Sequence, residues 1–107
     1  MAELRAENDR RGIVGLTQAV AAHAYGLSLK ELASRNRVAD EARQVAMYLA
    51  RVGLRLGLRE TARGFGRNHK AVTHACRRVE EAREDPAFDR TVEWLETTLR
   101  RAAGATP

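Results

Sequence analysis

The chain has 107 residues, 44% of them apolar and only 5% aromatic, so we expect a single domain over residues 1–107 with one modest, mainly aliphatic core. No apolar run is long enough to span a membrane, the first residues lack the layout of a secretion signal, and a single cysteine rules out an internal disulfide framework. These features predict a cytoplasmic protein with no membrane partner. The net charge of +5 originates in residues 35–83, where twelve Lys and Arg face five Asp and Glu. Such a segment indicates either a polyanionic partner or simply a solvated surface.

The predicted elements are all helices, because no alternating run of β-branched residues exceeds a few positions. Residues 1–11 are polar and charged, which is typical of a flexible or weakly helical end. Apolar residues then recur at helical spacing until Gly26, which ends the first predicted helix. Ser28 and Glu31 form a capping box that starts a short helix over about 28–34. The stripe predicted to be buried in the first helix consists of Ile13, Leu16, Val20 and Ala24.

A basic loop occupies residues 35–40 and ends at Asp40, which is a good N-cap for a helix over about 41–55. That helix has a regular apolar face, and its small residues Ala42 and Ala46 allow neighbouring helices to approach closely. The residues predicted to form its buried stripe are Val45, Leu49, Val52 and Leu56.

Residues 58–63 form a further short helix that ends at Gly64-Phe65-Gly66, where two glycines permit a tight turn and Phe65 anchors the core. Asn68 is then a good N-cap for a longer helix that continues to about Glu84. Its predicted buried stripe is Val72, Ala75, Val79 and Ala82, and its outward face carries His69, Lys70, Thr73, Arg77 and Arg78.

The last predicted helix, over about 86–101, packs against the rest of the domain. Asp85 is its N-cap and Pro86 occupies the first helical position, where a missing N–H costs nothing. Trp94 lies off the apolar stripe and is expected to be a partly buried packing residue. The stripe itself consists of Phe88, Val92, Leu95 and Leu99.

Two helices joined by a short glycine-containing turn, the second of them polar on one face, form the helix-turn-helix pattern. The first turn of the second helix must present donors and acceptors to base edges in the major groove of duplex DNA. Asn suits adenine and Lys suits guanine, while Thr contacts either a base edge or a thymine methyl. The pattern therefore indicates a reader of DNA sequence. The alternative is an ordinary pair of helices with a solvated face.

Residues 25–84 resemble the C-terminal DNA-binding domain (domain IV) of the bacterial replication initiator DnaA. The run from Gly66 to Arg78, Gly-Arg-Asn-His-Lys-Ala-Val-Thr-His-Ala-Cys-Arg-Arg, is similar to that family's signature Gly-Arg-Asp-His-Thr-Thr-Val-x-His-Ala-Cys-Arg-Lys. The run from Ala42 to Ala50 resembles a second block of the family at the appropriate separation. The resemblance implies an all-α, compact bundle of about six helices with a TrpR-like helix-turn-helix, in which residues 86–101 form a packing helix.

The resemblance also implies a division of roles among the polar residues, with double-stranded DNA as the partner. Arg35 and Arg37 become candidates for the minor groove, and Arg43 and Gln44 for contacts to the DNA backbone and groove edge. Arg67 becomes a phosphate contact. The candidate base readers and their neighbours on the same face are Asn68, His69, Lys70, Thr73 and Arg77.

The chain departs from the family at positions that would set base preference. Its basic loop is about two residues shorter than usual, and Glu41-Ala42 stands where the family has a proline. Asn68 replaces an aspartate, and Lys70-Ala71 replaces a threonine pair. We therefore expect a DNA preference that differs from the standard initiator site, or lower selectivity.

No Gly-x4-Gly-Lys-[Ser/Thr] nucleotide loop is present, so the chain should not act as an initiator by itself. The favoured function is a standalone transcriptional regulator at the nucleoid, for example an activator of gene-transfer-agent or prophage genes that works with a partner protein contacting RNA polymerase. The alternatives are a competitor at initiator sites and a protein–protein adapter that uses the N-terminal helix or Trp94.

Catalysis, cofactors and small-molecule substrates have no support, because no nucleophile motif or convincing carboxylate pair is present. A metal site can be imagined from His69, His74 and Cys76, but their spacing points them in different directions around one helix. Cys76 is expected to be a small buried apolar residue. His74 is expected to be packed and hydrogen-bonded.

Overall fold

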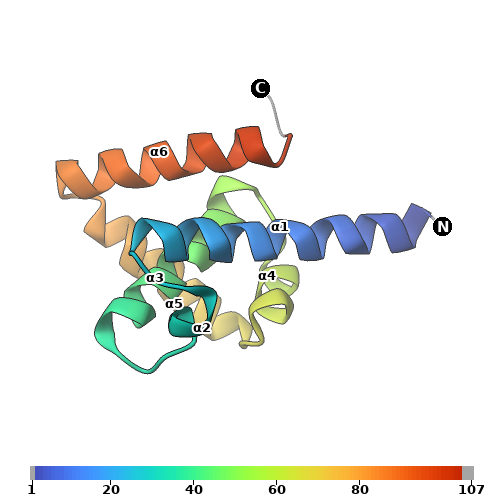
Figure 1. Ribbon diagram of the computed structural model, residues 1–107, viewed down its shortest axis with the longest axis horizontal. Helices are drawn as coiled ribbons and strands as arrows, with labels where there is room; N and C mark the ends of the chain where they lie inside the picture. The colour runs from blue at the N-terminus through green and yellow to red at the C-terminus, as the bar shows by residue number, and fades with distance from the viewer. Residues whose placement is uncertain (1, 105–107) are drawn as a thin grey trace.

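The computed structural model describes residues 2–104, and describes side chains from Gly12 onward. All of its regular elements in this range are helical, which confirms the predicted class (Figure 1). The elements are α1 (Ala2–Ala24), α2 (Leu29–Leu32), α3 (Arg37–Tyr48), a π-helical segment η1 (Leu49–Gly53), α4 (Leu58–Phe65), α5 (His69–Ala82) and α6 (Pro86–Ala102).

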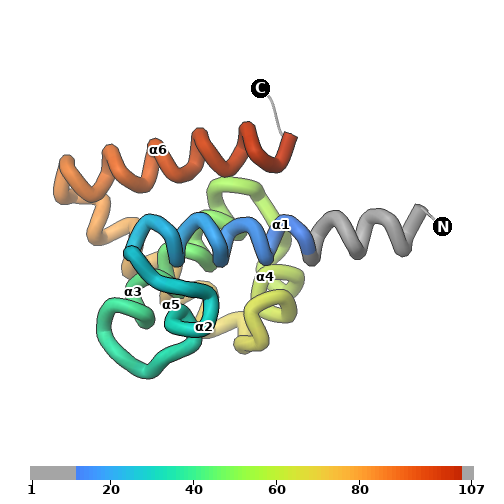
Figure 2. The backbone as a smooth tube through the Cα atoms, viewed as in Figure 1, coloured from blue at the N-terminus to red at the C-terminus, as the bar shows by residue number. Residues whose placement is uncertain are grey.

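The long helices surround α3, which packs on both α1 and α5 (Figure 2). Residues of α3 and η1 meet the inner face of α6 in the largest apolar cluster, and all of its central members are at most 4% exposed. These members are Val45, Tyr48, Leu49, Val79, Val92, Leu95 and Leu99. The apolar stripe predicted for α6 is thus confirmed at Val92, Leu95 and Leu99, while Phe88 is only half-buried against the same cluster.

Helix α1 starts earlier and faces the core differently from the prediction. Its bounds include residues 2–11, whereas the first clear helical spacing in the sequence starts at Ile13. Whether residues 1–11 are flexible lies outside what the structure describes. Among its described side chains, Val14, Thr17, Ala21 and Ala22 are buried, whereas Ala24 is exposed, because the face that α1 turns to the core is shifted by about one residue from the predicted stripe. The Thr17 hydroxyl donates to the Val14 carbonyl oxygen at 2.7 Å, which satisfies the hydroxyl in this apolar setting.

Helix α3 begins four residues before its predicted start. Asn36, not Asp40, is the N-cap, since its Oδ1 accepts a hydrogen bond from the Ala39 N–H at 2.9 Å. The extra turn is favourable because it buries Ala39 completely. Residues 37–40 are consequently helical, and the loop between α2 and α3 is reduced to residues 33–36.

Helix α3 continues directly into the π-helical segment η1, and this change of helical period alters which residues are buried. Leu49 and Leu56 are buried as predicted, but Val52 is 38% exposed, so its assignment to the stripe was wrong. A π turn holds more residues than an α turn, so a stripe extrapolated at the α-helical period no longer faces the core. The segment ends at Gly53 with Leu54 as its C-cap, and Arg55 follows with a φ of 60°.

Arg83, just after α5, joins three helices through its guanidinium. It donates to Asp89 at 2.5 Å and to Glu96 at 2.6 Å, both on α6, and to the Tyr48 hydroxyl of α3 at 2.8 Å. Arg100 also donates to the second oxygen of Glu96, at 3.1 Å. The carboxylate of Glu96, a residue only 9% exposed, is thereby paired on both oxygens, which offsets the cost of removing its charge from water.

Candidate nucleic-acid interface

Helices α4 and α5 are joined by a turn that has the geometry expected of a helix-turn-helix. Gly66 ends α4 with a φ of 64°, a left-handed conformation that costs glycine little. Gly64 has another role, because it lies within α4 and a Cβ at its position would meet Val14 Cγ2 at 2.8 Å. Gly66 therefore makes the turn, whereas Gly64 permits the close approach of α1 to α4.

A small apolar cluster sets the angle between α4 and α5. Ala62 of α4 packs against Val72 and Ala75 of α5, with Met47 of α3 beneath them. Phe65 is half-buried and contacts this cluster as well as the one around Val14. Ala82, the last residue of the predicted α5 stripe, is exposed, because the next residue, Arg83, is the one that faces α3 and α6.

Asn68 is the N-cap of α5, as the sequence predicted. Its Oδ1 accepts a hydrogen bond from the Ala71 N–H at 2.8 Å, and its backbone is extended. This bond fixes the orientation of the amide, so the side-chain NH₂ group is the part directed to solvent with both donors unused. Asn68 can therefore offer hydrogen-bond donors to a ligand, but its oxygen already holds the helix start.

The first two turns of α5 present a polar surface to solvent. His69, Lys70, Thr73 and Arg77 are all exposed, and so is Arg67 in the turn before them. The Thr73 hydroxyl donates to the His69 carbonyl oxygen at 3.0 Å, which leaves its own oxygen lone pairs able to accept. Together with the Asn68 amide, these side chains form a donor-rich surface at the N-terminal end of a helix, where the helix dipole favours anions.

Arg43 fastens the loop between α2 and α3. Its Nη1 donates to the Leu32 carbonyl at 2.5 Å and to the Ser34 carbonyl at 2.7 Å, and its Nη2 pairs with Asp40 at 3.3 Å. These bonds satisfy carbonyl groups at the end of α2 that have no partner within that helix. Arg43 thus holds the segment that carries Arg35 and Arg37, whose side chains are exposed.

Sequence comparison gives the family of this chain. The model of the bacterial DnaA protein helix-turn-helix matches residues 16–79, which is more than half of the chain. The chain belongs to this family.

Relatives and solved structures agree with that assignment. The chromosomal replication initiator protein DnaA of Caulobacter vibrioides is 40% identical over 101 residues, and that of Symbiobacterium thermophilum is 38% identical over 92. These matches cover 91% and 82% of this chain but only 20% of either relative. Among solved structures, a DNA replication initiation factor superposes with a TM-score of 0.83 at 33% identity, over 92% of this chain and 32% of the other. A replication initiator DnaA bound to AMPPCP and single-stranded DNA gives 0.80 at the same identity. The DnaA fold is thus confirmed, and the chain spans about a fifth of the length of the curated relatives it matches.

On the DnaA fold the candidate DNA-contacting residues fall into two exposed groups and a half-buried pair on α3. The first group is at the start of α5, and the second is Arg35 in the α2–α3 loop with Arg37 at the start of α3. Arg43 and Gln44 lie between these groups on α3 and are half-buried. Gln44 lines a shallow hollow between α3 and α5 together with Arg78. Sequence reasoning did not single out two exposed apolar residues near this group, namely Leu29 at the start of α2, which is 60% exposed, and Val38 in the first turn of α3, which is 49% exposed. The only available signal for Val38 was the competing N-cap at Asn36.

Two expectations for the remaining residues of α5 need correction. His74 is exposed, not packed, because it lies on the solvent side of the helix. Cys76 is half-buried beside Arg51 and Thr73, and its burial raises the pKa of the thiol. No group of three potential metal ligands occurs in the described part of the chain. Between residues 2 and 104, no helix is long and apolar enough to cross a membrane.

Proposed function

We propose that the chain binds double-stranded DNA, with the start of α5 in the major groove and the α2–α3 loop against the neighbouring backbone and minor groove. The observation that carries the proposal is the arrangement at the α4–α5 turn. A helix held by the Ala62–Val72 contact presents Asn68, His69 and Lys70 to solvent at its N-terminus, with Arg67 beside them. A recognition helix must be held in place by the first helix of the motif, and its N-terminal residues must offer polar groups to the base edges.

The unused hydrogen-bond donors at the N-terminus of α5 indicate which bases the helix would select. Lys70 and the Asn68 amide both donate, and guanine offers two acceptors, O6 and N7, at its major-groove edge. Bidentate reading of adenine by Asn68 would need the Oδ1 atom that caps the helix. We therefore propose a preference for guanine opposite Asn68 and Lys70.

Binding and its electrostatic component are tested by titrating labelled duplex DNA at several salt concentrations. Because phosphate contacts release counterions, the affinity of a binder with about six such contacts falls steeply with salt. Arg67→Ala should weaken binding to all duplexes about equally and lower the salt slope by about one. Arg101→Ala on α6 removes the same charge far from α5 and serves as the matched control. Equal effects of the two variants, or no binding at low salt, would refute the proposal.

Sequence reading is tested with Lys70→Ala and Asn68→Asp. Lys70→Ala should cost about 1–3 kcal/mol on the preferred duplex and relax its sequence choice. Asn68→Asp keeps an oxygen that can cap α5, since Asp and Asn are comparable N-caps, but removes the two amide donors. It should therefore leave the thermal stability nearly unchanged and alter the selected bases. If a library selection returns the same sequence for both variants and the parent, α5 does not read bases.

We further propose that the bound sites lie at promoters and that the protein regulates their transcription, together with a partner that contacts RNA polymerase. The support is the set of departures at Asn68, Lys70 and Ala71, which argue for a preference other than that of replication initiators. A DNA ligand would place the protein at the nucleoid in the cytoplasm. Mapping of bound DNA across the genome, followed by reporter fusions to the nearest promoters, tests this role. Enrichment at initiator sites without any change in reporter activity would favour competition with the initiator instead.

A further inference from the structure

Trp94 is the most exposed large apolar side chain in the described part of the chain. It is 64% exposed, and it is the only tryptophan in the sequence. The sequence-based expectation of a partly buried packing residue was therefore wrong. The core of α6 is complete without it, because Val92, Leu95 and Leu99 occupy the opposite side of the helix. An exposed tryptophan with no packing role is a feature of binding surfaces, where its large area and its indole N–H are both usable.

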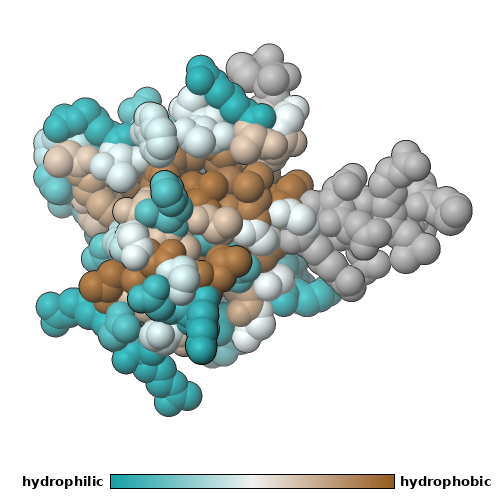
Figure 3. Space-filling model, in the orientation of Figure 1, coloured by the Kyte–Doolittle hydropathy of each residue, from teal (hydrophilic) through white to brown (hydrophobic). Residues whose placement is uncertain are grey.

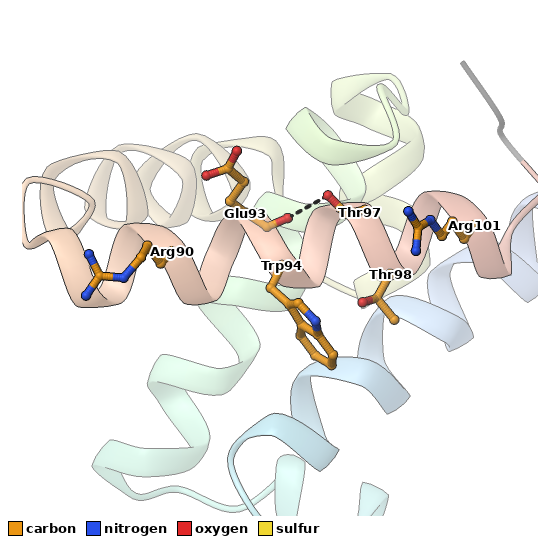
Figure 4. Close-up of a pocket in the computed structure, with 6 residues that line it drawn as sticks. All are labelled: Arg90, Glu93, Trp94, Thr97, Thr98 and Arg101. Atoms are coloured by element: carbon orange, nitrogen blue, oxygen red, sulfur yellow. Dashed lines mark hydrogen bonds between the residues drawn. The ribbon is translucent and has the colours of Figure 1, made fainter.

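The residues around Trp94 form a defined stripe on the outer face of α6. Arg90 precedes Trp94 by four residues and Arg101 follows it by seven, so all three lie on one side of the helix. At 1.5 Å per residue, the guanidinium groups are attached about 6 Å before and about 10 Å after the tryptophan along the helix axis. Figure 4 shows the tryptophan ring between the two arginines, with Thr97 and Thr98 completing the shallow hollow around it. We call this set of five residues the α6 stripe.

Both arginines of the α6 stripe lack a neutralising carboxylate in the described part of the chain. Arg90 and Arg101 have no ion-pair partner among the described residues, in contrast to Arg83 and Arg100 on the inner side. Glu93 is the one carboxylate at the edge of the hollow, and Figure 4 shows it pointing away from Trp94. The stripe thus has an apolar centre with a positive charge at either end.

We propose that the α6 stripe is a docking surface for an acidic amphipathic helix of another protein. Such a helix would set an apolar side chain against the Trp94 ring and place carboxylates near Arg90 and Arg101. Charge complementarity of this kind fixes the register of the partner, while the buried indole contributes most of the affinity.

Two other occupants fit the charges less well. A second copy of the chain would bring four guanidinium groups of Arg90 and Arg101 to one interface against two Glu93 carboxylates. A nucleic acid would approach the most acidic part of the protein, because residues 84–107 hold five Asp and Glu against three Arg. The basic segment 35–83 is the better site for phosphates.

The position of α6 would allow this partner and DNA to be bound together. In Figure 1, α6 lies along the top of the molecule, and the α4–α5 turn lies at the bottom with α1 and α3 between them. In the space-filling view of Figure 3 the upper edge and the lower edge are separated by a largely apolar band. The docking surface does not depend on the proposed DNA binding, but the geometry permits a ternary complex.

The sole tryptophan makes the test direct, because the tryptophan emission of the folded chain comes from Trp94 alone. The probe is a synthetic alanine-based helical peptide with Glu at two positions eleven residues apart and Leu between them. Its counterpart has Lys in place of both Glu. We expect the Glu peptide to shift the emission to the blue with a saturable titration, and the Lys peptide to bind at least tenfold more weakly. Prebound duplex DNA should not displace the Glu peptide.

Charge reversal at both ends of the stripe is the decisive control. In the double variant R90E/R101E, which leaves Trp94 and the core in place, the preference should invert toward the Lys peptide. The double variant K30E/R59E, an equal change of charge on exposed residues of α2 and α4, should leave the titration as in the parent. An unchanged spectrum with the Glu peptide or equal binding of both peptides would overturn the proposal. So would a shift on dilution without peptide, which indicates a second copy, or a shift caused only by single-stranded DNA.

Discussion

Replacement of Gly64 by alanine tests whether the contact between α1 and α4 sets the position of the helix-turn-helix. The added Cβ would meet Val14 Cγ2 at 2.8 Å and Cγ1 at 3.1 Å, which is closer than such atoms approach in folded proteins. Val14 is only 6% exposed and β-branched, so it cannot rotate away freely. Overpacking of this kind costs about 1–3 kcal/mol. Replacing glycine by alanine within a helix gains about 1 kcal/mol, so we expect a net loss of about 1 kcal/mol.

Gly15→Ala separates the steric cost from the helix propensity. Gly15 is also helical, but a Cβ there meets nothing within 4 Å. This variant should therefore be more stable than the parent by up to about 1 kcal/mol. Since the propensity gain is common to both, the difference between the two variants isolates the contact with Val14.

Thermal and urea unfolding followed by circular dichroism measure both quantities. A loss of 1 kcal/mol should lower the Tm by about 4–8 °C for a domain of this size. In a Val14→Ala background, which removes both Cγ atoms, Gly64→Ala should become neutral or stabilising. If Gly64→Ala is as stabilising as Gly15→Ala in the parent background, α1 and α4 do not approach each other as closely as the structure indicates.

Three further predictions concern single side chains. Arg83→Met removes the hydrogen-bond donors to Tyr48, Asp89 and Glu96 and should lower the free energy of urea unfolding by about 2 kcal/mol. Arg90 has no ion pair with a described residue, so Arg90→Met should change this free energy little. Because burial raises the pKa of Cys76, the folded chain at pH 8 should react with iodoacetamide several times more slowly than the urea-unfolded chain; equal rates would contradict the burial. The Ser28 backbone N–H and hydroxyl lower the pKa of Glu31. The capping box therefore stabilises α2 fully at pH values above the ordinary carboxyl pKa of about 4.3. This stabilisation is lost as the pH falls through the lowered pKa of Glu31. NMR titration should find the pKa of Glu31 below the ordinary carboxyl value, and Ser28→Ala, which removes the hydroxyl but keeps the backbone N–H, should restore it only in part.

The fold was predictable from the sequence where local signals and the helical period agree. The capping box at Ser28, the N-cap at Asn68 and the turn at Gly66 all lie where their residue types place them. The start of α3 was not predictable in this way, because Asn36 and Asp40 are equally good N-caps. The choice between them depends on the burial of Ala39 and on the bonds of Arg43, which involve residues from another helix.

The remaining errors have a common physical origin in the ends of the helices. Val52 was assigned to the core by continuing a 3.6-residue period into a segment that is π-helical. Ala82 was assigned by stepping three residues on from Val79, whereas the residue after it, Arg83, is the one that faces α3 and α6. A hydrophobic period gives the direction in which a residue faces, but not whether another element lies there.

The candidate site was predictable in its exposure and less so in its hydrogen bonding. Lys70, Thr73 and Arg77 are exposed as the pattern indicated. The sequence could not reveal that the guanidinium of Arg43 is engaged with two backbone carbonyls, since those carbonyls have no signature in the side chains. It also could not reveal that the Oδ1 atom of Asn68 serves the helix rather than a ligand.

The bonds of Arg43 have a consequence for the speed of association. Loops that must order on binding lose conformational entropy and often need a slow rearrangement after the first encounter. The segment that carries Arg35 and Arg37 is already fixed to α3 by Arg43 before any ligand arrives. Encounter with a polyanion should then be a single kinetic step whose rate is governed by ionic strength. The Arg43→Ala variant would lose these bonds, and the loop would have to order after the first encounter. Stopped-flow traces of binding should then show a second phase whose rate does not depend on salt.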